Sequence, residues 1–249
     1  MSGHSKWASI KRAKGKADQA RGKLFSRLIK EITIAAKLGG GDPEGNPRLR
    51  SAINTARNSN MPNKNIDNAI LKGTGQLDGV SYEEATFEAY GPGGVAVVIE
   101  CLTDNKNRTV SEIRHVITKA GGNLGAANSV MWMFHSKGII HVAREAADEE
   151  KLMEAALDAG ADDMTEVGDE FVVTTSPEAF EDVKTAIEKA GITPTSSELT
   201  KEPENTVKVE GENAARILKL INALDDLDDT QSVYSNFDVS DEDMKAFEG

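Results

Sequence analysis

The sequence predicts a multidomain α+β protein, in which an N-terminal three-helix domain is followed by two α/β domains, the second ferredoxin-like and inserted in the other. The hydrophobic pattern has helical spacing up to about residue 79, and beyond it strand and helix patterns alternate. Segment 138–203 carries the order β-α-β-β-α-β of a ferredoxin-like unit. The charge divides as well, because residues 1–75 hold 15 of the 29 Lys and Arg but only 5 of the 41 Asp and Glu.

Residues 18–38 form the clearest predicted helix, because apolar side chains recur there on one helical face. That face consists of Leu24, Phe25, Leu28, Ile29, Ile32, Ala35 and Ala36. Cationic side chains occupy the opposite side, at Lys23, Arg27, Lys30 and Lys37, with Ile34 among them. We expect the glycines of segment 39–41 to end the helix.

Two shorter helices complete the predicted helical domain. The second begins with Asn46 as N-cap and Pro47 in the first helical position, an order that favours a helix start. Its inner face consists of Leu49, Ala52, Ile53 and Ala56. The third follows Pro62, with Asn63 as its cap and Gly73 at its end. Its inner residues are Ile66, Ala69 and Ile70.

Strands and helices alternate after residue 80. Segments 87–90 and 95–103 flank Gly91-Pro-Gly-Gly94 and predict a hairpin. A helix is expected at 106–120, and segments 130–135 and 138–142 predict two strands joined by a turn at 136–137. The remaining expected helices are 148–159, 177–190 and 212–224, and the remaining strands are 163–167, 170–175, 195–200, 206–209 and 231–237.

These elements place the domain boundaries at 1–79 for the helical domain, 80–135 with 205–249 for one α/β domain, and 136–204 for the ferredoxin-like domain. A sequential arrangement, in which the flanking pieces do not pair, is the alternative. Three helices end in an Ala-Gly pair, at Gly121, Gly160 and Gly191, and each glycine suits a left-handed helix cap.

Composition excludes several classes of protein. No apolar run approaches the roughly 20 residues that span a bilayer, and the basic N-terminus is not followed by a signal-peptide core. We therefore expect a cytoplasmic protein without membrane attachment. The lone Cys101 lies in a predicted strand and indicates a buried, unreactive thiol.

No cofactor, metal or catalytic group is predicted. The four histidines lack the spacing of a zinc site, and His135 and His141 are expected to face each other across a hairpin. The acidic run from Asp225 to Asp229 lacks the glycine and the closing Glu of a calcium loop, so it indicates a solvated helix exit. No serine–histidine–aspartate or paired-carboxylate arrangement follows from spacing.

The positive charge of the N-terminal segment predicts contacts with nucleic-acid phosphates, since Lys and Arg neutralise the backbone whatever its sequence. The predicted contact residues of the N-terminal arm, the segment before the first helix, are Lys6, Trp7, Lys11, Arg12, Lys14 and Lys16. Those of the first helix are Arg21, Lys23, Arg27 and Lys30. Only Trp7 and Phe25 are aromatic in residues 1–75, so base stacking is scarce and recognition of phosphates and shape is favoured. A solvated arm without a partner is the alternative.

Several motifs resemble the YebC family along the whole chain. They are Gly3-His-Ser-Lys-Trp7, Arg21-Gly-Lys-Leu-Phe25, Asn46-Pro-Arg-Leu-Arg50, Asn60-Met-Pro62, Tyr90-Gly-Pro-Gly-Gly94, Thr103-Asp-Asn-Lys-Asn-Arg-Thr109 and Gly121-Gly-Asn-Leu-Gly125. The resemblance implies an N-terminal helical domain and two α/β domains. It also implies a cytoplasmic DNA-binding transcriptional regulator, or a ribosome-associated or mitochondrial translational activator. Ala126-Ala-Asn-Ser129 departs from the family pattern and leaves the shape of that loop open.

A second anion site is predicted where a strand gives way to the helix at 106–120. Lys106 and Arg108 fall near the positive end of this helix, where cations oppose the helix dipole unless a phosphate binds. In the alternative, Asp104 caps the helix and the two cations point into water.

The sequence therefore predicts a non-enzymatic, monomeric, nucleic-acid-binding regulator of gene expression that uses residues 1–75. DNA-binding transcriptional regulation is placed ahead of translational activation through ribosomal RNA, because it is the usual description of the resembling family. The acidic α/β body would contact the ribosome or a protein partner. A metal-dependent phosphoesterase and a pure protein-interaction role are the rivals from other classes.

Overall fold

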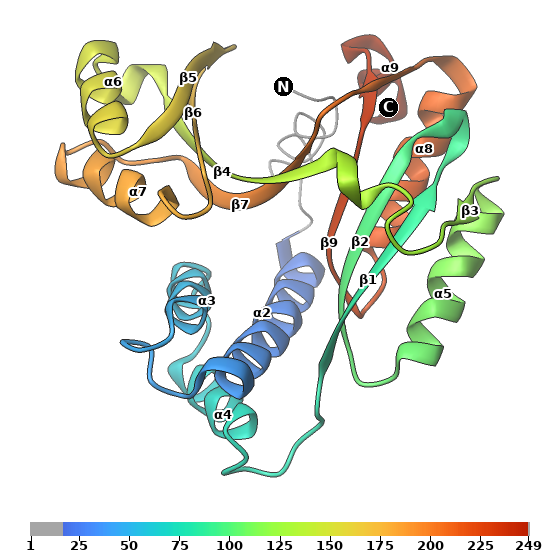
Figure 1. The fold of residues 1–249 in the computed structure, drawn as a ribbon, viewed down its shortest axis with the longest axis horizontal. Helices are drawn as coiled ribbons and strands as arrows, with labels where there is room; N and C mark the ends of the chain where they lie inside the picture. The colour runs from blue at the N-terminus through green and yellow to red at the C-terminus, as the bar shows by residue number, and fades with distance from the viewer. Residues whose placement is uncertain (1–16, 249) are drawn as a thin grey trace. The chain divides into compact units, whose positions relative to one another are not determined.

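The computed structural model describes residues 17–248 and divides the chain into two compact units (Figure 1). The first unit contains residues 1–131 and 206–249, and the second contains residues 132–205. The second unit is therefore inserted in the sequence of the first. No described helix is long and apolar enough to span a bilayer.

Three helices form the helical part of the first unit: α2 (Ala17–Gly39), α3 (Pro47–Asn58) and α4 (Asn63–Gly73). Helices α3 and α4 both pack on α2 and bury most of the predicted apolar residues, with Ile32, Leu49 and Ala56 fully buried. Two residues of α2 differ from the prediction, since Leu24 is exposed and Ile34 is buried. The side chain of Asn46 caps α3 as predicted, since its Oδ1 accepts a hydrogen bond from the Leu49 N–H at 3.1 Å.

The predicted cap of α4 is wrong by one residue. Pro62 is the N-cap residue, Asn63 is the first helical residue, and no side chain caps the helix. Pro62 supplies extended backbone before the helix, which is the geometry that an N-cap residue needs. Gly73 lies so close to α2 that a Cβ atom would stand 2.3 Å from the Thr33 carbonyl oxygen, which accounts for a glycine at this position.

The sheet of the first unit has the strand order β3-β1-β2-β9. Its strands are β1 (Glu83–Tyr90), β2 (Ala96–Thr103), β3 (Asn123–Leu124) and β9 (Thr230–Ser235). Strands β1 and β2 form the predicted hairpin around a short 3-10 turn at Pro92–Gly94. Strand β9 pairs with β2, so the pieces of chain on either side of the insertion share one sheet.

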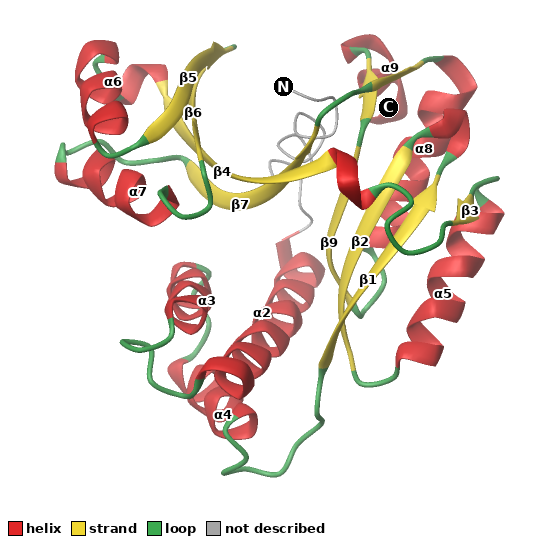
Figure 2. Ribbon diagram, in the orientation of Figure 1, coloured by secondary structure: helices red, strands yellow, loops and turns green. Residues whose placement is uncertain are grey.

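Helices α5 (Lys106–Lys119) and α8 (Gly211–Asp225) pack on one face of this sheet and build the largest apolar core (Figure 2). The predicted C-terminal strand is divided into β9 and β10 (Phe237–Val239). Strand β10 pairs in parallel with β8 (Val207–Val209), apart from the main sheet. The chain then forms α9 (Asp241–Glu248), a helix that the sequence pattern did not predict.

The second unit has the ferredoxin-like topology that the sequence predicts. Its elements are β4 (Phe134–Ala143), α6 (Glu149–Asp158), β5 (Ala161–Val167), β6 (Glu170–Thr175), α7 (Phe180–Lys189) and β7 (Ser196–Pro203). The sheet order is β5-β6-β4-β7 with all neighbours antiparallel. Helices α6 and α7 share one apolar core with the sheet, and α7 begins three residues later than predicted.

The predicted hairpin at 130–142 is wrong, because residues 134–143 form the single strand β4. The Ser-Lys-Gly sequence at 136–138 suggested a turn, but Gly138 serves packing. A Cβ atom there would lie 2.3 Å from Thr175 Oγ1 and 2.4 Å from Phe180 Cδ2. His135 and His141 therefore lie on the same strand and do not face each other across a turn.

The three Ala-Gly helix ends behave as predicted. Gly121, Gly160 and Gly191 have φ angles of 85°, 97° and 78°, in the left-handed region that favours glycine. In each case the chain leaves the helix through this residue. The local sequence pattern therefore gave the ends of α5, α6 and α7 correctly.

Candidate nucleic-acid interface

The cationic face of α2 lies against the acidic segment, which we define as residues 225–229, from the last residue of α8 to the start of β9. Lys23, Arg27 and Lys30 follow one another at helical spacing, so their side chains project from one side. Each one meets a different carboxylate. The nitrogen–oxygen distances are 2.9 Å for Lys23–Asp226, 2.8 Å for Arg27–Asp225 and 2.8 Å for Lys30–Asp229.

Asp229 is the most strongly held member of the acidic segment. Its Oδ1 accepts from Lys30 Nζ at 2.8 Å, and its Oδ2 accepts from Arg108 Nη2 at 2.7 Å, from Thr109 Oγ1 at 2.8 Å and from Thr103 Oγ1 at 3.1 Å. The residue is buried, with 3% of its surface exposed. A buried carboxylate thus connects the helical part of the first unit with β2 and α5.

The electrostatics follow from these contacts. Burial alone would raise the pKa of Asp229, but the hydrogen bonds from Lys30, Arg108 and Thr109 hold the pKa well below its usual range. The hydrogen bonds to Asp229 and Asp104 raise the pKa of the Arg108 guanidinium above its ordinary value. Asp229 is therefore ionised at neutral pH, and its charge is compensated within the protein.

The same side chains line an open groove with a volume of about 1280 Å³. Tyr82 also lines it, with its ring centroid 5.5 Å from Lys30 Nζ, within the range of a cation–π contact. Both cations and carboxylates line it, and the carboxylates include Glu112 and Asp228. The groove is therefore of mixed charge and does not offer a polyanion a uniformly positive wall.

The start of α5 shows what occupies the second predicted anion site. Asn105, and not Asp104, is the N-cap residue, and its Oδ1 accepts from the Arg108 N–H at 3.1 Å. Arg108 pairs with Asp104 at 2.7 Å and with Asp229, so two carboxylates of the protein lie where a phosphate was expected. Lys106, at the first position of α5, is exposed.

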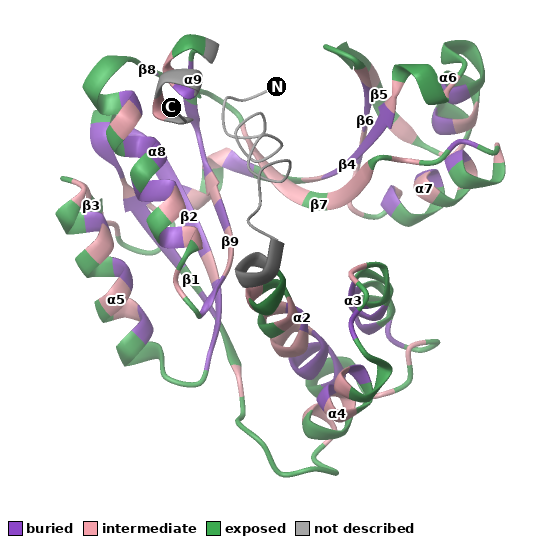
Figure 3. Ribbon diagram, turned by 180° about the vertical axis from the view of Figure 1, so that it is seen from behind, coloured by how far each residue is buried: buried purple, intermediate pink, exposed green. Residues whose placement is uncertain are grey.

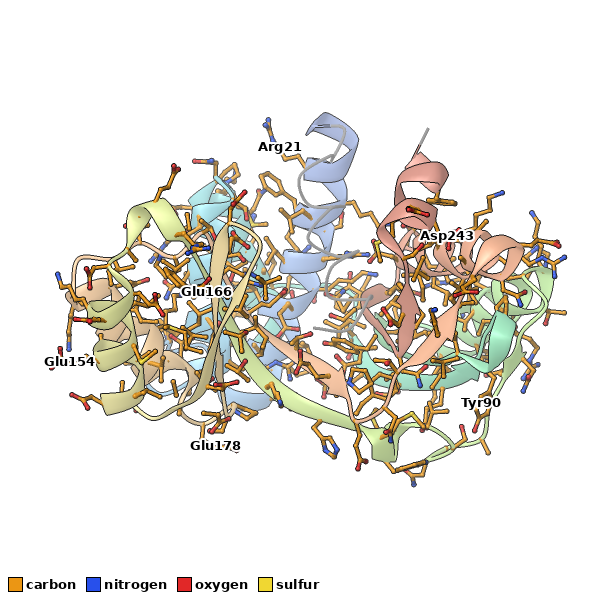
Figure 4. The ribbon with its side chains drawn as sticks, turned by 90° about the horizontal axis from the view of Figure 1, so that it is seen from above. Arg21, Tyr90, Glu154, Glu166, Glu178 and Asp243 are labelled. Carbon is orange, nitrogen blue, oxygen red and sulfur yellow. The ribbon has the colours of Figure 1, made fainter. Side chains whose placement is uncertain are left out.

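The remaining predicted contact residues belong to the N-terminal arm. Lys6, Trp7, Lys11, Arg12, Lys14 and Lys16 lie outside the described residues. Arg21 is exposed, and Figure 4 shows its side chain extending from the start of α2. Of the predicted residues that the structure describes, Lys23, Arg27, Lys30 and Arg108 are ion-paired within the protein, and Arg21 and Lys106 are exposed.

Two buried carboxylates, Asp229 and Glu88, were not predicted from the sequence. Asp229 was counted with a solvated acidic run, an interpretation that is wrong for this residue because it is buried. Glu88, on β1, accepts backbone hydrogen bonds from Asn128, Val130 and Met131 at 2.6, 2.8 and 2.8 Å. Burial would raise the pKa of Glu88, but these hydrogen bonds lower it below its ordinary value. Glu88 thereby fixes the loop at 126–131, whose shape the sequence left open.

Cys101 and His141 are the other buried groups with reactive or titratable side chains that the sequence analysis named. Cys101 is a free thiol and is buried, as predicted, and burial raises its pKa to about 12. His141 is buried, and its Nδ1 lies 3.0 Å from Glu170 Oε2. Within residues 17–248 no group of three or more His, Cys, Asp or Glu side chains is arranged to hold a metal ion.

A helical region followed by α/β sheets, with a ferredoxin-like unit inserted between two strands of one sheet, defines the class of this α+β protein. Two family models cover most of the chain. The model described as the TACO1/YebC protein N-terminal domain matches residues 5–76, and the model described as the TACO1/YebC second and third domain matches residues 82–237. The chain belongs to the TACO1/YebC family, as the sequence motifs predicted.

Individual relatives agree along nearly the full length. "Probable transcriptional regulatory protein GSU1074" of Geobacter sulfurreducens is 56% identical over 245 residues, which are 98% of this chain and 99% of the relative. A "Probable transcriptional regulatory protein" of Dictyoglomus turgidum is 54% identical over 243 residues, 97% of this chain and 98% of the relative. The crystal structure of the conserved hypothetical protein Aq1575 from Aquifex aeolicus matches with a TM-score of 0.82 and 47% identity, over 91% of this chain and 93% of that chain.

Proposed function

We propose that this protein is a non-enzymatic regulator of gene expression that binds nucleic acid through its basic N-terminal region, with DNA as the target and transcription as the process. The observation that carries the proposal is the excess of cations in residues 1–75, which hold 15 Lys and Arg against 5 Asp and Glu. Such a segment favours a polyanion, whereas the acidic remainder disfavours indiscriminate binding. The names of the relatives as transcriptional regulatory proteins support the same process.

The ion pairs on α2 divide the proposed contact residues into two kinds. Lys23 and Asp226 keep 28% and 74% of their side-chain surfaces exposed, and an exposed ion pair contributes only about 0–1 kcal/mol. A phosphate can therefore replace Asp226 at little cost. Lys30 and Asp229 keep only 13% and 4% exposed, so exchanging this carboxylate would leave a buried charge unpaired. Lys30 and Arg108 thus act by holding Asp229, and Lys23 with the arm contacts phosphates.

The proposal is tested by the salt dependence of binding. The logarithm of the affinity for duplex DNA should fall linearly with the logarithm of the salt concentration, by about 0.9 for each phosphate contact. Replacing Lys11, Arg12, Lys14 and Lys16 by Gln in the full chain should lower that slope by about 3 to 4 if all four contact phosphates. An unchanged slope would refute the role of the arm.

Crosslinking in cells, followed by sequencing of the bound DNA and RNA, identifies the target. Enrichment of promoter DNA is expected. Enrichment of ribosomal RNA would instead favour translational activation, the alternative that the sequence leaves open. A metal-dependent phosphoesterase activity of the purified chain would contradict the non-enzymatic role.

A further inference from the structure

Helices α3 and α4 carry a second group of cations, none of which is among the residues predicted to bind nucleic acid. Residues 47–73 contain five cations and one carboxylate, Asp67. Arg48 is already ion-paired within the protein, with Glu31 at 2.6 Å and with Glu84 at 2.8 Å. Arg50, Arg57 and Lys64 are exposed, and no carboxylate pairs with them among residues 17–248 in the way that the acidic segment pairs with α2.

Two of these cations lie on the same side of α3. Arg50 and Arg57 are seven residues apart on α3, which is nearly two full turns, so they project from the same side about 10.5 Å apart along the axis. Asn54 lies between them on that side and is exposed. A four-residue turn, 59–62, then leads to Lys64 in the first turn of α4 (Figure 1). Figure 3 shows the exposed residues of both helices in green.

Lys64 occupies a position that the helix itself disfavours. The first turn of α4 carries the positive end of the helix dipole, contains no acidic residue and has no side-chain cap. A cation there costs about 0.3–1 kcal/mol, which an external anion would offset. Asp67 lies three residues after Lys64, on the same side of α4, and is the single carboxylate of this surface.

Amide side chains surround the cations. Asn54 is exposed on α3, and Asn58, Asn60 and Asn63 are exposed on or beside the turn between the helices. Amides donate to phosphate oxygens and can pair with the edges of bases in a groove. Residues 47–73 contain no Phe, Trp, Tyr or His, so this surface offers no ring on which an unpaired base could stack.

From this combination we propose that the exposed side of α3 and α4, with Arg57, Lys64 and Asn54 as its central residues, binds the backbone of a nucleic-acid duplex. The inference rests on the proposed function and adds to it a second contact surface and a preference for stacked, double-stranded nucleic acid. Charge complementarity selects a polyanion, and the missing aromatic rings select a duplex over a single strand.

The test compares a double variant, Arg57→Gln with Lys64→Gln, against a control that removes the same charge elsewhere. The control is Lys119→Gln with Lys219→Gln, two exposed lysines on α5 and α8. Binding is measured as a function of salt with duplex DNA, duplex RNA and single-stranded DNA of equal length. The double variant should lower the salt slope on a duplex by about 2, since each lost phosphate contact lowers it by about 1, whereas the control should leave it unchanged.

A second variant probes the same surface without removing a cation. Asn54→Asp keeps the size of the side chain but places a carboxylate between Arg50 and Arg57, so duplex affinity should fall at least fivefold at constant salt. Asn213→Asp, in the exposed first turn of α8, is its control. The duplex, DNA or RNA, on which the variants lose affinity identifies the target.

The outcomes separate this inference from the proposed function. If the wild-type chain binds a duplex but both surface variants bind with unchanged slope and affinity, the α3–α4 surface is refuted while the role of the arm stands. If the variants lose affinity only for the single strand, the preference for a duplex is refuted. If the wild-type chain binds none of the three probes, both proposals fail.

Discussion

Replacing Asp229 by Asn tests whether the buried carboxylate holds the first unit together. Asn keeps one acceptor oxygen but replaces the other with an NH2 group, which would face either Lys30 or Arg108, the two cations that now lie 2.8 and 2.7 Å from the carboxylate. Removing one partner of a buried ion pair costs about 3–5 kcal/mol. Since 44% of the Arg108 side chain is exposed and can regain water, we expect the lower end of this range.

We therefore expect the free energy of unfolding to fall by about 3 kcal/mol at pH 7, roughly a 150-fold change in the unfolding equilibrium constant. Urea unfolding followed by circular dichroism measures this loss of stability, and hydrogen exchange in α2 and β9 shows where the structure is weakened. Asp226→Asn is the matched control, because that carboxylate is exposed and should change stability by less than about 1 kcal/mol. Equal, small losses in the two variants would refute the reasoning.

The pH dependence gives an independent check. Because the folded-state pKa of Asp229 is lowered, its stabilisation is fully present above the unfolded-state pKa of about 4 and is lost as the pH falls through the folded-state pKa. The difference in stability between the wild type and Asp229→Asn should therefore narrow as the pH falls below about 4. A difference that stays constant from pH 7 to pH 3 would show that the carboxylate charge is not its source.

Three further changes test individual packing and charge assignments. Glu88→Gln should lower the free energy of unfolding by about 1–3 kcal/mol and speed hydrogen exchange at Val130 and Met131. The loss of stability should disappear at acid pH, because the folded-state pKa of the Glu88 carboxyl is lowered. Unchanged exchange at Val130 and Met131 would contradict the role of Glu88. Gly138→Ala should lower the stability of the second unit by about 1–3 kcal/mol in thermal unfolding, because its methyl group meets Thr175 on β6 and Phe180 on α7, and an unchanged melting temperature would contradict this. Cys101, with a pKa of about 12, should react with iodoacetamide at pH 8 only after denaturation, and rapid reaction of the native chain would contradict its burial.

Local patterns were sufficient for most of the fold. The cap at Asn46 and the left-handed glycines are properties of a few neighbouring residues, so the sequence alone predicts them. The hairpin predicted at 130–142 is wrong because Gly138 is needed for close packing against Phe180, which is 42 residues away in the sequence. Strand β4 is continuous because of tertiary packing, and a turn signal in the sequence does not reveal such packing.

The candidate site was harder to predict for the same reason. The acidic segment and the cations of α2 are each visible in the sequence, but Lys30 and Asp229 are 199 residues apart. The sequence pattern therefore predicts the cations of α2 as phosphate contacts and the acidic segment as solvated. Arg57 is exposed whereas the Lys30 side chain is mostly buried. This difference depends on which face of each helix packs against another element.

Counting charges along the chain consequently overstates the positive surface of the helical region, because Lys23, Arg27 and Lys30 already meet carboxylates of residues 225–229. Salt acts unequally on what remains. At 0.15 M salt the screening length is about 8 Å, so exposed pairs and phosphate contacts weaken while a buried pair is screened much less. Raising the salt should therefore release nucleic acid from exposed cations such as Arg57 while the buried Lys30–Asp229 pair continues to join α2 to the sheet. A salt slope measured on the intact chain then reports contacts with nucleic acid and not the opening of the first unit, which is the condition that both binding tests require.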